Sequence, residues 1–409
     1  MKGGESEGSC LPHIADELSW IKEGDMRRIG IVVLAALAFL GLSVLAEGNI
    51  KAGFIYVGPI GDYGWSYAHE RARQIVDQEF DWLDTVYVES VPEGEVETFI
   101  DQLVAQGCNV IFATSFGFMD GTLAAAQRHP DVIFAHCSGF KRAPNMATYM
   151  ADFYQVYYLN GLMAGALTKT GKIGYVGAFP IPEVKRHINA FTIGAREVNP
   201  NAEVHVKWIY EWFNPAAAKE AAEALIAEGC DVFAFTEDSP TVVQVAAEHG
   251  LPSFGHYSPM YDFAPDYVVS GQLVHWEAIY RDFLKKIHDG IYTPKNLQHV
   301  DYWWLLSQGA VEVAAKPGMM INPAFEDDLK AYVIDHPVFG KISAYDLVMT
   351  RHSQMADPGV TFDPFQGPVY DRKGNLVIPE GMWPSVDTLI TLEWAVEGVV
   401  GPWPGEPEE

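Results

Sequence analysis

Aromatic side chains recur in the segments that directly follow short apolar runs of this 409-residue sequence. Trp65 and Phe116 lie in such segments of the first half, and Phe179 and Tyr257 lie in those of the second half. Flat aromatic faces suit a planar heterocyclic ligand, because stacking contributes about 1 to 3 kcal/mol per base. Packing between lobes is the alternative role, and we expect it for part of this set.

Two carboxylates, Asp62 and Asp238, lie in the same kind of segment. Each could accept a hydrogen bond from a ring N–H, an amino group or a sugar hydroxyl. Each could instead cap a helix, since Asp238 is followed by Ser239 and Pro240 at the start of a helical pattern. Ligand contact and capping both remain open from the sequence.

A further aromatic candidate is Trp212, which with Trp208 precedes residues 213–215 at the end of another predicted strand. One of these tryptophans could close a pocket, and a core role is the alternative. Asp120 is a weaker candidate because it could face solvent. We assign Trp212 to the candidate site.

Signatures of catalysis are missing from the sequence. The glycines at 58, 61 and 64 have the wrong spacing for a dinucleotide fingerprint, and neither GxxxxGK[ST] nor GxSxG occurs. His136 and His256 fall at corresponding positions of a repeated pattern, which favours a shared structural role over metal binding. We therefore expect no catalytic residue, no metal and no cofactor.

The elements that position these residues come from an internal duplication with an offset of about 121 residues. Three pairs of similar segments occur in the same order: 51–58 with 172–177, 103–113 with 225–235, and 134–138 with 254–258. Within each half, short apolar strands alternate with helical patterns, which predicts βαβ units and a parallel sheet. We expect two doubly wound lobes that face each other, with the loops beyond the carboxyl ends of the strands lining the cleft.

Composition favours a small-molecule partner. The formal net charge is −27, which would repel nucleic acid and anionic membrane surfaces. Cys108, Cys137 and Cys230 cannot all pair, and parallel strands would hold Cys108 and Cys137 too far apart for a disulfide. We expect buried reduced thiols, with a redox or metal role as the alternative.

The amino-terminal region has the pattern of an export signal. Met26, Arg27 and Arg28 precede an apolar run over residues 29–45, and small residues lead to Glu47. An uncleaved anchor is the alternative, although 17 apolar residues are marginal for a membrane span. We expect a signal peptide over about 26–46, a free periplasmic protein with no stable membrane insertion after processing, and a translation start at either Met1 or Met26.

Several segments together resemble the BMP (basic membrane protein) family, the purine nucleoside receptor type of periplasmic binding protein. The resemblance covers about 51–401 and is most specific at 58–69, 114–120, 158–177, 179–184, 236–240 and 365–371. It implies a type I periplasmic binding protein fold and a receptor that delivers a purine nucleobase or nucleoside, such as adenine, to an ABC permease. By motif position it implies ligand contacts at Trp65, Phe116, Phe179 and Asp238. Pro259 departs from the aspartate expected in the family's loop, so the identity of the purine stays open.

We therefore expect a monomer in which residues 50–157 and about 272–300 form the first lobe. Residues 158–271 and about 301–401 form the second lobe, residues 1–46 are an extension and signal peptide, and residues 402–409 are a frayed tail. The candidate ligand site comprises Asp62, Trp65, Phe116, Phe179, Trp212, Asp238 and Tyr257. An α/β enzyme acting on nucleosides and a sensory ligand-binding module are the alternative functions.

Overall fold

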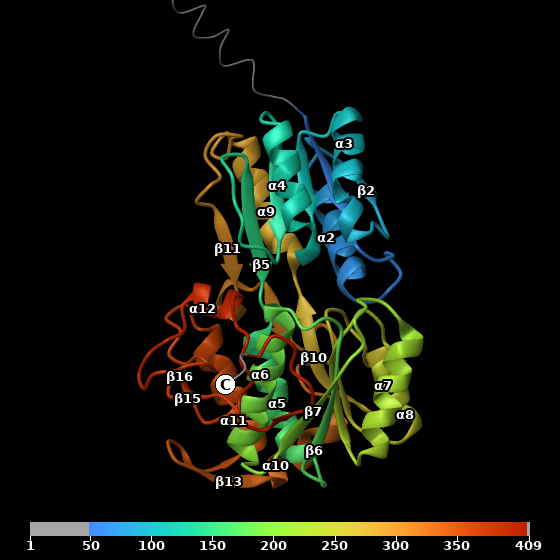
Figure 1. Cartoon of the computed structure of the whole chain (residues 1–409). Helices are drawn as coiled ribbons and strands as arrows, with labels where there is room; N and C mark the ends of the chain where they lie inside the picture. Colours follow the sequence, from blue (N-terminus) through green and yellow to red (C-terminus); the bar gives the residue numbers. More distant parts are fainter. Residues whose placement is uncertain (1–48, 407–409) are drawn as a thin grey trace, which may run out of the picture. The chain divides into compact units, whose positions relative to one another are not determined.

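The computed structural model describes residues 49–406, and its ordered elements form two sheets flanked by helices (Figure 1). The sheet of the first lobe has the order β11-β5-β4-β3-β1-β2, and all its neighbouring strands run parallel. Its strands are β1 (Ile50–Ile55), β2 (Leu83–Val88), β3 (Val110–Ala113), β4 (Ile133–Cys137), β5 (Met146–Ala151) and β11 (Asp301–Trp304). Its helices are α2 (Trp65–Glu79), α3 (Val96–Ala105), α4 (Met119–Arg128) and α9 (Trp276–His288).

The sheet of the second lobe has the order β12-β10-β9-β8-β6-β7-β17, and only β12 runs antiparallel to its neighbour. Its strands are β6 (Lys172–Gly177), β7 (Glu203–Trp208), β8 (Val232–Thr236), β9 (Ser253–Gly255), β10 (Val268–Val274), β12 (Val311–Val313) and β17 (Val399–Val400). The helices of this lobe are α5 (Tyr154–Leu167), α6 (Pro182–Val198), α7 (Pro215–Ala227), α8 (Thr241–Glu248), α10 (Pro323–Ala331), α11 (Ala344–Ala356) and α12 (Val386–Ile390). Two small hairpins complete it: β13 (Val333–His336) with β14 (Gly340–Ser343), and β15 (Val369–Tyr370) with β16 (Leu376–Ile378).

The two sheets repeat one topology, as the duplication in the sequence predicts. The order β2-β1-β3-β4-β5 of the first lobe corresponds to β7-β6-β8-β9-β10 of the second. In both lobes the chain runs outward from the first strand to one side and then to the other, which is the doubly wound arrangement. The predicted α/β fold class with two doubly wound lobes is confirmed.

The chain crosses between the lobes where β5 leads into α5, where β10 leads into α9, and where β11 leads into β12. α9 packs against α2 and β5 of the first lobe. β11 pairs with β5, so residues 301–304 belong to the first sheet rather than to the second lobe as expected. The predicted return to the second lobe at about residue 301 is therefore too early. Strand pairing decides which lobe a segment joins, and the local sequence pattern does not encode that pairing.

The expected frayed tail is also corrected for residues 402–406. Trp403 is buried, and its indole N–H donates to the carbonyl of Glu393 at 2.8 Å. Arg372 forms an ion pair with Glu406 at 2.6 Å. These contacts dock the segment on the second lobe, because an indole buries enough apolar area to order a short acidic stretch.

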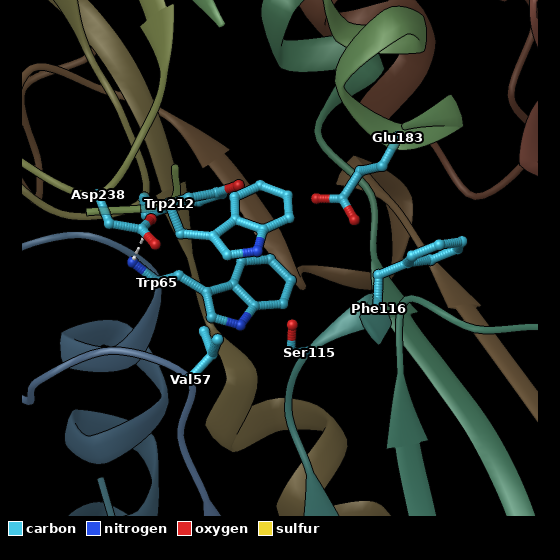
Figure 2. Close-up of a pocket in the computed structure, with 8 residues that line it drawn as sticks. Val57, Trp65, Ser115, Phe116, Glu183, Trp212 and Asp238 are labelled. Atoms are coloured by element: carbon cyan, nitrogen blue, oxygen red, sulfur yellow. Dashed lines mark hydrogen bonds between the residues drawn. The ribbon is translucent and has the colours of Figure 1, made fainter. Parts of the chain in front are cut away.

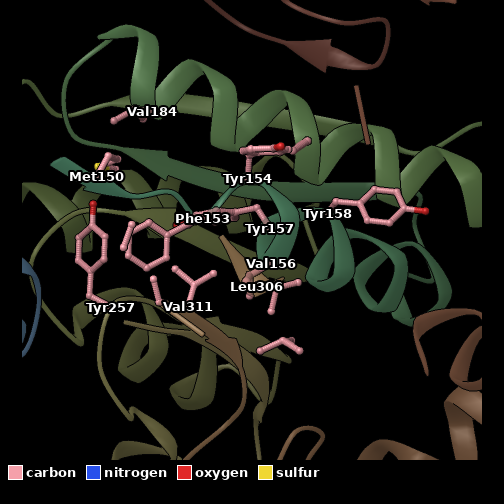
Figure 3. Close-up of a cluster of buried hydrophobic side chains, with 14 of the residues drawn as sticks. Met150, Phe153, Tyr154, Val156, Tyr157, Tyr158, Val184, Tyr257, Leu306 and Val311 are labelled. Carbon is pink, nitrogen blue, oxygen red and sulfur yellow. The ribbon is translucent and has the colours of Figure 1, made fainter. Parts of the chain in front are cut away.

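The cores of the lobes meet at the first crossover (Figure 3). Phe153 follows β5 and packs on Tyr257 with 5.1 Å between ring centroids. Behind it, Gly161 and Gly165 let α5 approach α6 closely, because a Cβ at either position would overlap the carbonyl of Phe191 or Ala195. The two glycines therefore allow the close packing of α5 on α6.

Cys108, Cys137 and Cys230 are unpaired and buried, as predicted. Among residues 49–406, no helix is long and apolar enough to cross a membrane. The predicted signal peptide, its cleavage site and the alternative start at Met26 lie outside the described residues.

Candidate ligand-binding site

A cavity lies at the carboxyl ends of the strands of both lobes, where the doubly wound topology places ligand sites (Figure 2). The first lobe contributes segments that follow β1 and β3, and the second lobe contributes segments that follow β6, β7, β8 and β9. The lining side chains are Val57, Trp65, Ser115, Phe116, Glu183, Trp212, Asp238 and Tyr257. The structure thus brings together five of the seven predicted site residues and leaves Asp62 and Phe179 outside the lining.

Asp238 is the buried carboxylate of this cavity. Its Oδ1 accepts a hydrogen bond from the backbone N–H of Trp65 at 3.1 Å, whereas its Oδ2 is buried without a hydrogen-bond partner. Burial, with the nearby Asp62 carboxylate adding to it, raises the pKa of Asp238 well above its usual value. The capping alternative is wrong for Asp238, because α8 begins after Pro240 without a side-chain cap.

Asp62 has a local role instead. Its oxygens accept backbone hydrogen bonds from Gly64 at 2.8 Å, Tyr67 at 3.0 Å and Ser66 at 3.2 Å, so the side chain holds the first turn of α2. Burial raises the pKa of Asp62 to about 6. Asp62 therefore has the capping role, which was the alternative to ligand contact. Its side chain contributes to the site by fixing the start of α2, the helix that carries Trp65.

The two buried aromatic residues of the lining belong to opposite lobes. Trp65 begins α2, and its ring lies 5.1 Å from the ring of Tyr257 in an edge-on arrangement. The indole N–H of Trp65 donates to the carbonyl of Thr114, and the same ring packs edge-on against Trp276 at 5.2 Å. Trp65 therefore serves the core of the first lobe and the cavity together.

Trp212 follows β7 and lies over the cavity. Its ring lies 5.0 Å from the ring of Phe179, so Phe179 backs Trp212 from outside the lining. Its indole N–H donates to Glu93 Oε1 at 3.3 Å across the cleft. Trp208, the other tryptophan of this segment, lies away from the cavity and donates to the carbonyl of Pro402 at 2.8 Å.

Glu183 also lines the cavity, although it was not among the residues predicted from the sequence. Glu183 lies in the first turn of α6, directly after Pro182, where an acidic residue commonly complements the helix dipole. In the structure it is buried, it accepts a hydrogen bond from Ser138 of the first lobe, and its carboxylate faces the two indoles in Figure 2. Burial raises its pKa.

The lining has a consistent electrostatic character, because it contains two buried carboxylates and no lysine or arginine. Glu237, beside Asp238, is fully buried as well, and burial raises its pKa well above the usual value. Such a site favours ligands that present hydrogen-bond donors, since an unpaired buried carboxylate oxygen is costly. Anionic ligands are disfavoured for the same reason.

The other residues considered from the sequence, His136, His256 and Asp120, lie outside the cavity lining and bond to neighbouring protein groups. The ring Nε2–H of His136 donates to the carbonyl of Ser115 at 2.8 Å, and burial lowers the pKa of His136 to about 4. His256 lies 2.7 Å from the hydroxyl of Tyr157, and burial lowers its pKa too. Asp120 is exposed and forms an ion pair with Lys141. Within the described part of the chain, no group of three or more acidic, histidine or cysteine side chains is arranged to hold a metal.

Two mainly parallel sheets flanked by helices, with a cavity at the carboxyl ends of their strands, form the fold of the type I periplasmic binding proteins. Solved structures of this fold include a solute-binding protein of an ABC transporter from Aeropyrum pernix, with a TM-score of 0.63 and 16% identity over 78% of this chain and 94% of that one. A transcriptional activator of the comK gene from Bacillus halodurans shares the fold with a TM-score of 0.60 and 20% identity over 76% and 98%. At these identities the likeness concerns the fold alone.

The family of this chain follows from its sequence similarity to known proteins. Residues 49–333 match the Bmp family, described as ABC transporter substrate-binding protein, PnrA-like. A purine-binding protein of Brucella abortus is 36% identical over 90% of this chain and 98% of its own length. A Haloferax volcanii protein named as an ABC transporter glucose-binding protein is 39% identical over 70% of this chain and 72% of its own length. The chain belongs to the Bmp family of ABC transporter substrate-binding proteins, and it is a binding protein rather than an enzyme.

Proposed function

We propose that this solute-binding protein takes up a purine nucleobase or nucleoside in the cavity between its lobes and delivers it to an ABC permease. The observation that carries the proposal is Asp238 Oδ2, a buried acceptor without a partner that lies beside aromatic walls. A purine offers a flat face for the aromatic rings and ring or amino N–H groups for the carboxylates. The Brucella relative, which is named for purine binding, supports the same ligand class.

Adenine is the first compound to test within this class. The lining has two buried carboxylates and no cationic side chain, so it favours a base with an exocyclic amino donor over one with a carbonyl oxygen at the same position. Xanthine carries a carbonyl oxygen where adenine carries its 6-amino group. We therefore rank aminopurines above oxopurines as ligands.

A sugar is the second candidate, because the Haloferax relative is named for glucose binding. Carboxylates accept hydrogen bonds from hydroxyl groups, and aromatic rings pack against the apolar faces of sugars. The two candidates differ in how much stacking they require, since only a purine has an extended π-face.

The experiment is mass spectrometry of the ligand released from purified protein, followed by calorimetric titration with adenine, guanine, xanthine, adenosine and glucose. We expect saturable binding of at least one aminopurine and none of glucose. Binding of glucose alone would refute the purine assignment and leave the class of the protein intact.

Delivery to a permease requires the protein to lie outside the cytoplasm, and we propose a periplasmic location after cleavage before Glu47. The support is the basic, apolar and small-residue order of residues 26–46. Amino-terminal analysis of periplasmic extract is the test. A mature protein that still carries residues 1–25 would contradict both cleavage and the start at Met26.

A further inference from the structure

Glu93 is a carboxylate of the first lobe that contacts two lining residues without lining the cavity itself. It opens a short 3-10 helix at Glu93–Glu95, directly after Pro92. Its Oε1 accepts a hydrogen bond from the hydroxyl of Ser115 at 2.6 Å and one from the indole N–H of Trp212 at 3.3 Å. The first contact lies within the first lobe, and the second spans the cleft.

Trp212 is fixed at two points. Its backbone carbonyl accepts a hydrogen bond from the backbone N–H of Asp238 at 2.7 Å, which ties it to the second lobe. Its indole N–H reaches Glu93 in the first lobe. Phe179 packs against the indole ring at a tilt of 56°, and Glu93 accepts the hydrogen bond from its polar edge.

The space for this carboxylate depends on Gly117. A Cβ added to Gly117 would overlap the carboxylate of Glu93, and the backbone of Gly117 lies outside the left-handed region. An alanine at this position would therefore fit the backbone and displace the flexible end of Glu93. The glycine thus offers a way to move Glu93 without changing it.

We propose that Glu93 is a positioning residue that holds Trp212 over the bound ligand and retains the ligand by latching the lobes together. The proposal rests on the cavity being the ligand site, and it holds for a purine or a sugar. Hinge opening separates the lobes and breaks the bond between Glu93 and Trp212. The latch therefore acts on the closed, loaded protein and slows ligand release, while it leaves the open protein's capture of ligand unchanged.

The test compares association and dissociation rates by stopped flow for Glu93→Ala, Glu93→Gln and the matched control Glu95→Gln. Glu95 is an exposed carboxylate of the same 3-10 helix with no side-chain bond of this kind. We expect Glu93→Ala to raise the dissociation rate about tenfold with little change in association, as for loss of a hydrogen bond to a charged group. Glu93→Gln keeps an acceptor oxygen and should restore most of the slow release, and Glu95→Gln should match the parent.

Two further variants test whether Glu93 acts through its bond to Trp212 or has a general structural role. Trp212→Phe keeps the aromatic face and removes the indole N–H, so Glu93→Ala should have little further effect in that background. Gly117→Ala should raise the dissociation rate as Glu93→Ala does, and it should have no further effect when Glu93 is already alanine. Additive effects in either pair would overturn the proposal.

The probes are adenine and glucose, and the kinetic comparison uses whichever compound the parent binds. If adenine fails and glucose binds, the purine proposal fails while the latch is still tested. If neither binds, spin labels at Gln127 and Lys219, one exposed position on each lobe, report closure of the ligand-free protein by pulsed EPR after Cys10→Ser. A closed fraction that Glu93→Ala lowers supports the latch, and an unchanged distance distribution or dissociation rate overturns it.

Discussion

The backbone N–H of Trp65 in the first lobe donates to Oδ1 of Asp238 in the second lobe at 3.1 Å, whereas Oδ2 of the same carboxylate has no partner. Gly64 permits this approach, because a Cβ there would lie 2.6 Å from the Cα of Asp238. The carboxylate thus joins the lobes through Oδ1, and its residue lines the cavity with Oδ2 left without a partner. Closure of the cleft leaves an unsatisfied acceptor that a ligand N–H can satisfy.

We predict that Asp238→Asn weakens binding of the native aminopurine by about 1.5 to 3 kcal/mol, because two donors would then face each other without a buried acceptor. The asparagine oxygen can still accept from the backbone of Trp65, so lobe closure should persist. Its amide would place a donor where the ligand presents one. Calorimetric titration against a panel of bases and nucleosides is the measurement.

Asp120→Asn is the control for this prediction, because Asp120 is exposed and pairs with Lys141 at the surface. We expect the control to bind like the parent. Equal binding of every ligand by Asp238→Asn and the parent would show that Asp238 serves lobe closure alone.

We predict that Phe116→Ala weakens all purines alike, by about 1 to 3 kcal/mol, since stacking tolerates changes of ring substituent. Phe116 lines the cavity from a short 3-10 helix and is only partly buried. Trp65→Ala should also weaken all purines, but it removes packing against His69 and Trp276 and so lowers stability too. Titration combined with thermal unfolding separates the two effects, and a purine-selective loss in Phe116→Ala would argue against a stacking role.

Much of the fold could be predicted because repeated local patterns encode it. The segments around Lys51 and Lys172 both became first strands, and the cysteines at 108 and 230 precede equivalent strands β3 and β8. Strand-end loops then pointed to Trp65, Phe116, Trp212, Asp238 and Tyr257 as neighbours. The rule that ligands lie beyond the carboxyl ends of strands was sufficient to bring these residues together.

The rest depended on interactions that no local pattern contains. Glu183 resembles an ordinary acidic residue in a helix's first turn, and its position in the cavity lining follows from the way α6 meets the first lobe at Ser138. β11 pairs with β5 across about 150 residues of sequence, so the lobe boundary could not be placed by composition. Asp62 caps a helix and Asp238 does not cap the helix that follows it. The difference depends on the directions of backbone N–H groups, which the sequence does not give.

We predict that Gly161→Ala lowers the free energy of unfolding by about 1 to 3 kcal/mol, as expected for overpacking. Its Cβ would overlap the carbonyl of Phe191, and two packed helix backbones have no flexible side chain to move aside. Gly94→Ala is the control, because a Cβ there meets nothing within 4 Å. Chemical denaturation of both variants is the measurement, and equal stability of Gly161→Ala and the parent would show that α5 and α6 can separate at little cost.

Glu237 gives a prediction with a defined pH dependence. The side chain is fully buried, its Oε1 accepts from the hydroxyl of Ser239 at 3.0 Å, and its Oε2 has no partner. Burial raises its pKa, and the charge of Asp62 raises it further. The folded protein therefore holds this proton over a pH range in which the unfolded chain has lost it, and stability decreases as pH rises through that range.

We predict that Glu237→Gln stabilises the protein at pH 8 by about 1 to 3 kcal/mol, because the glutamine is neutral in both states and needs no proton taken up on folding. The difference between variant and parent should shrink as pH falls and should vanish below the pKa of an unfolded glutamic acid, where both states are protonated. His69, His136 and His256 are buried with lowered pKa values, so they reduce the stability of both proteins as pH falls. Only the difference in thermal midpoint between the two proteins, measured from pH 5 to pH 8, isolates Glu237. Glu220→Gln, an exposed change on α7, should give no such trend, and a constant difference across the pH range would contradict the assignment of a raised pKa to Glu237.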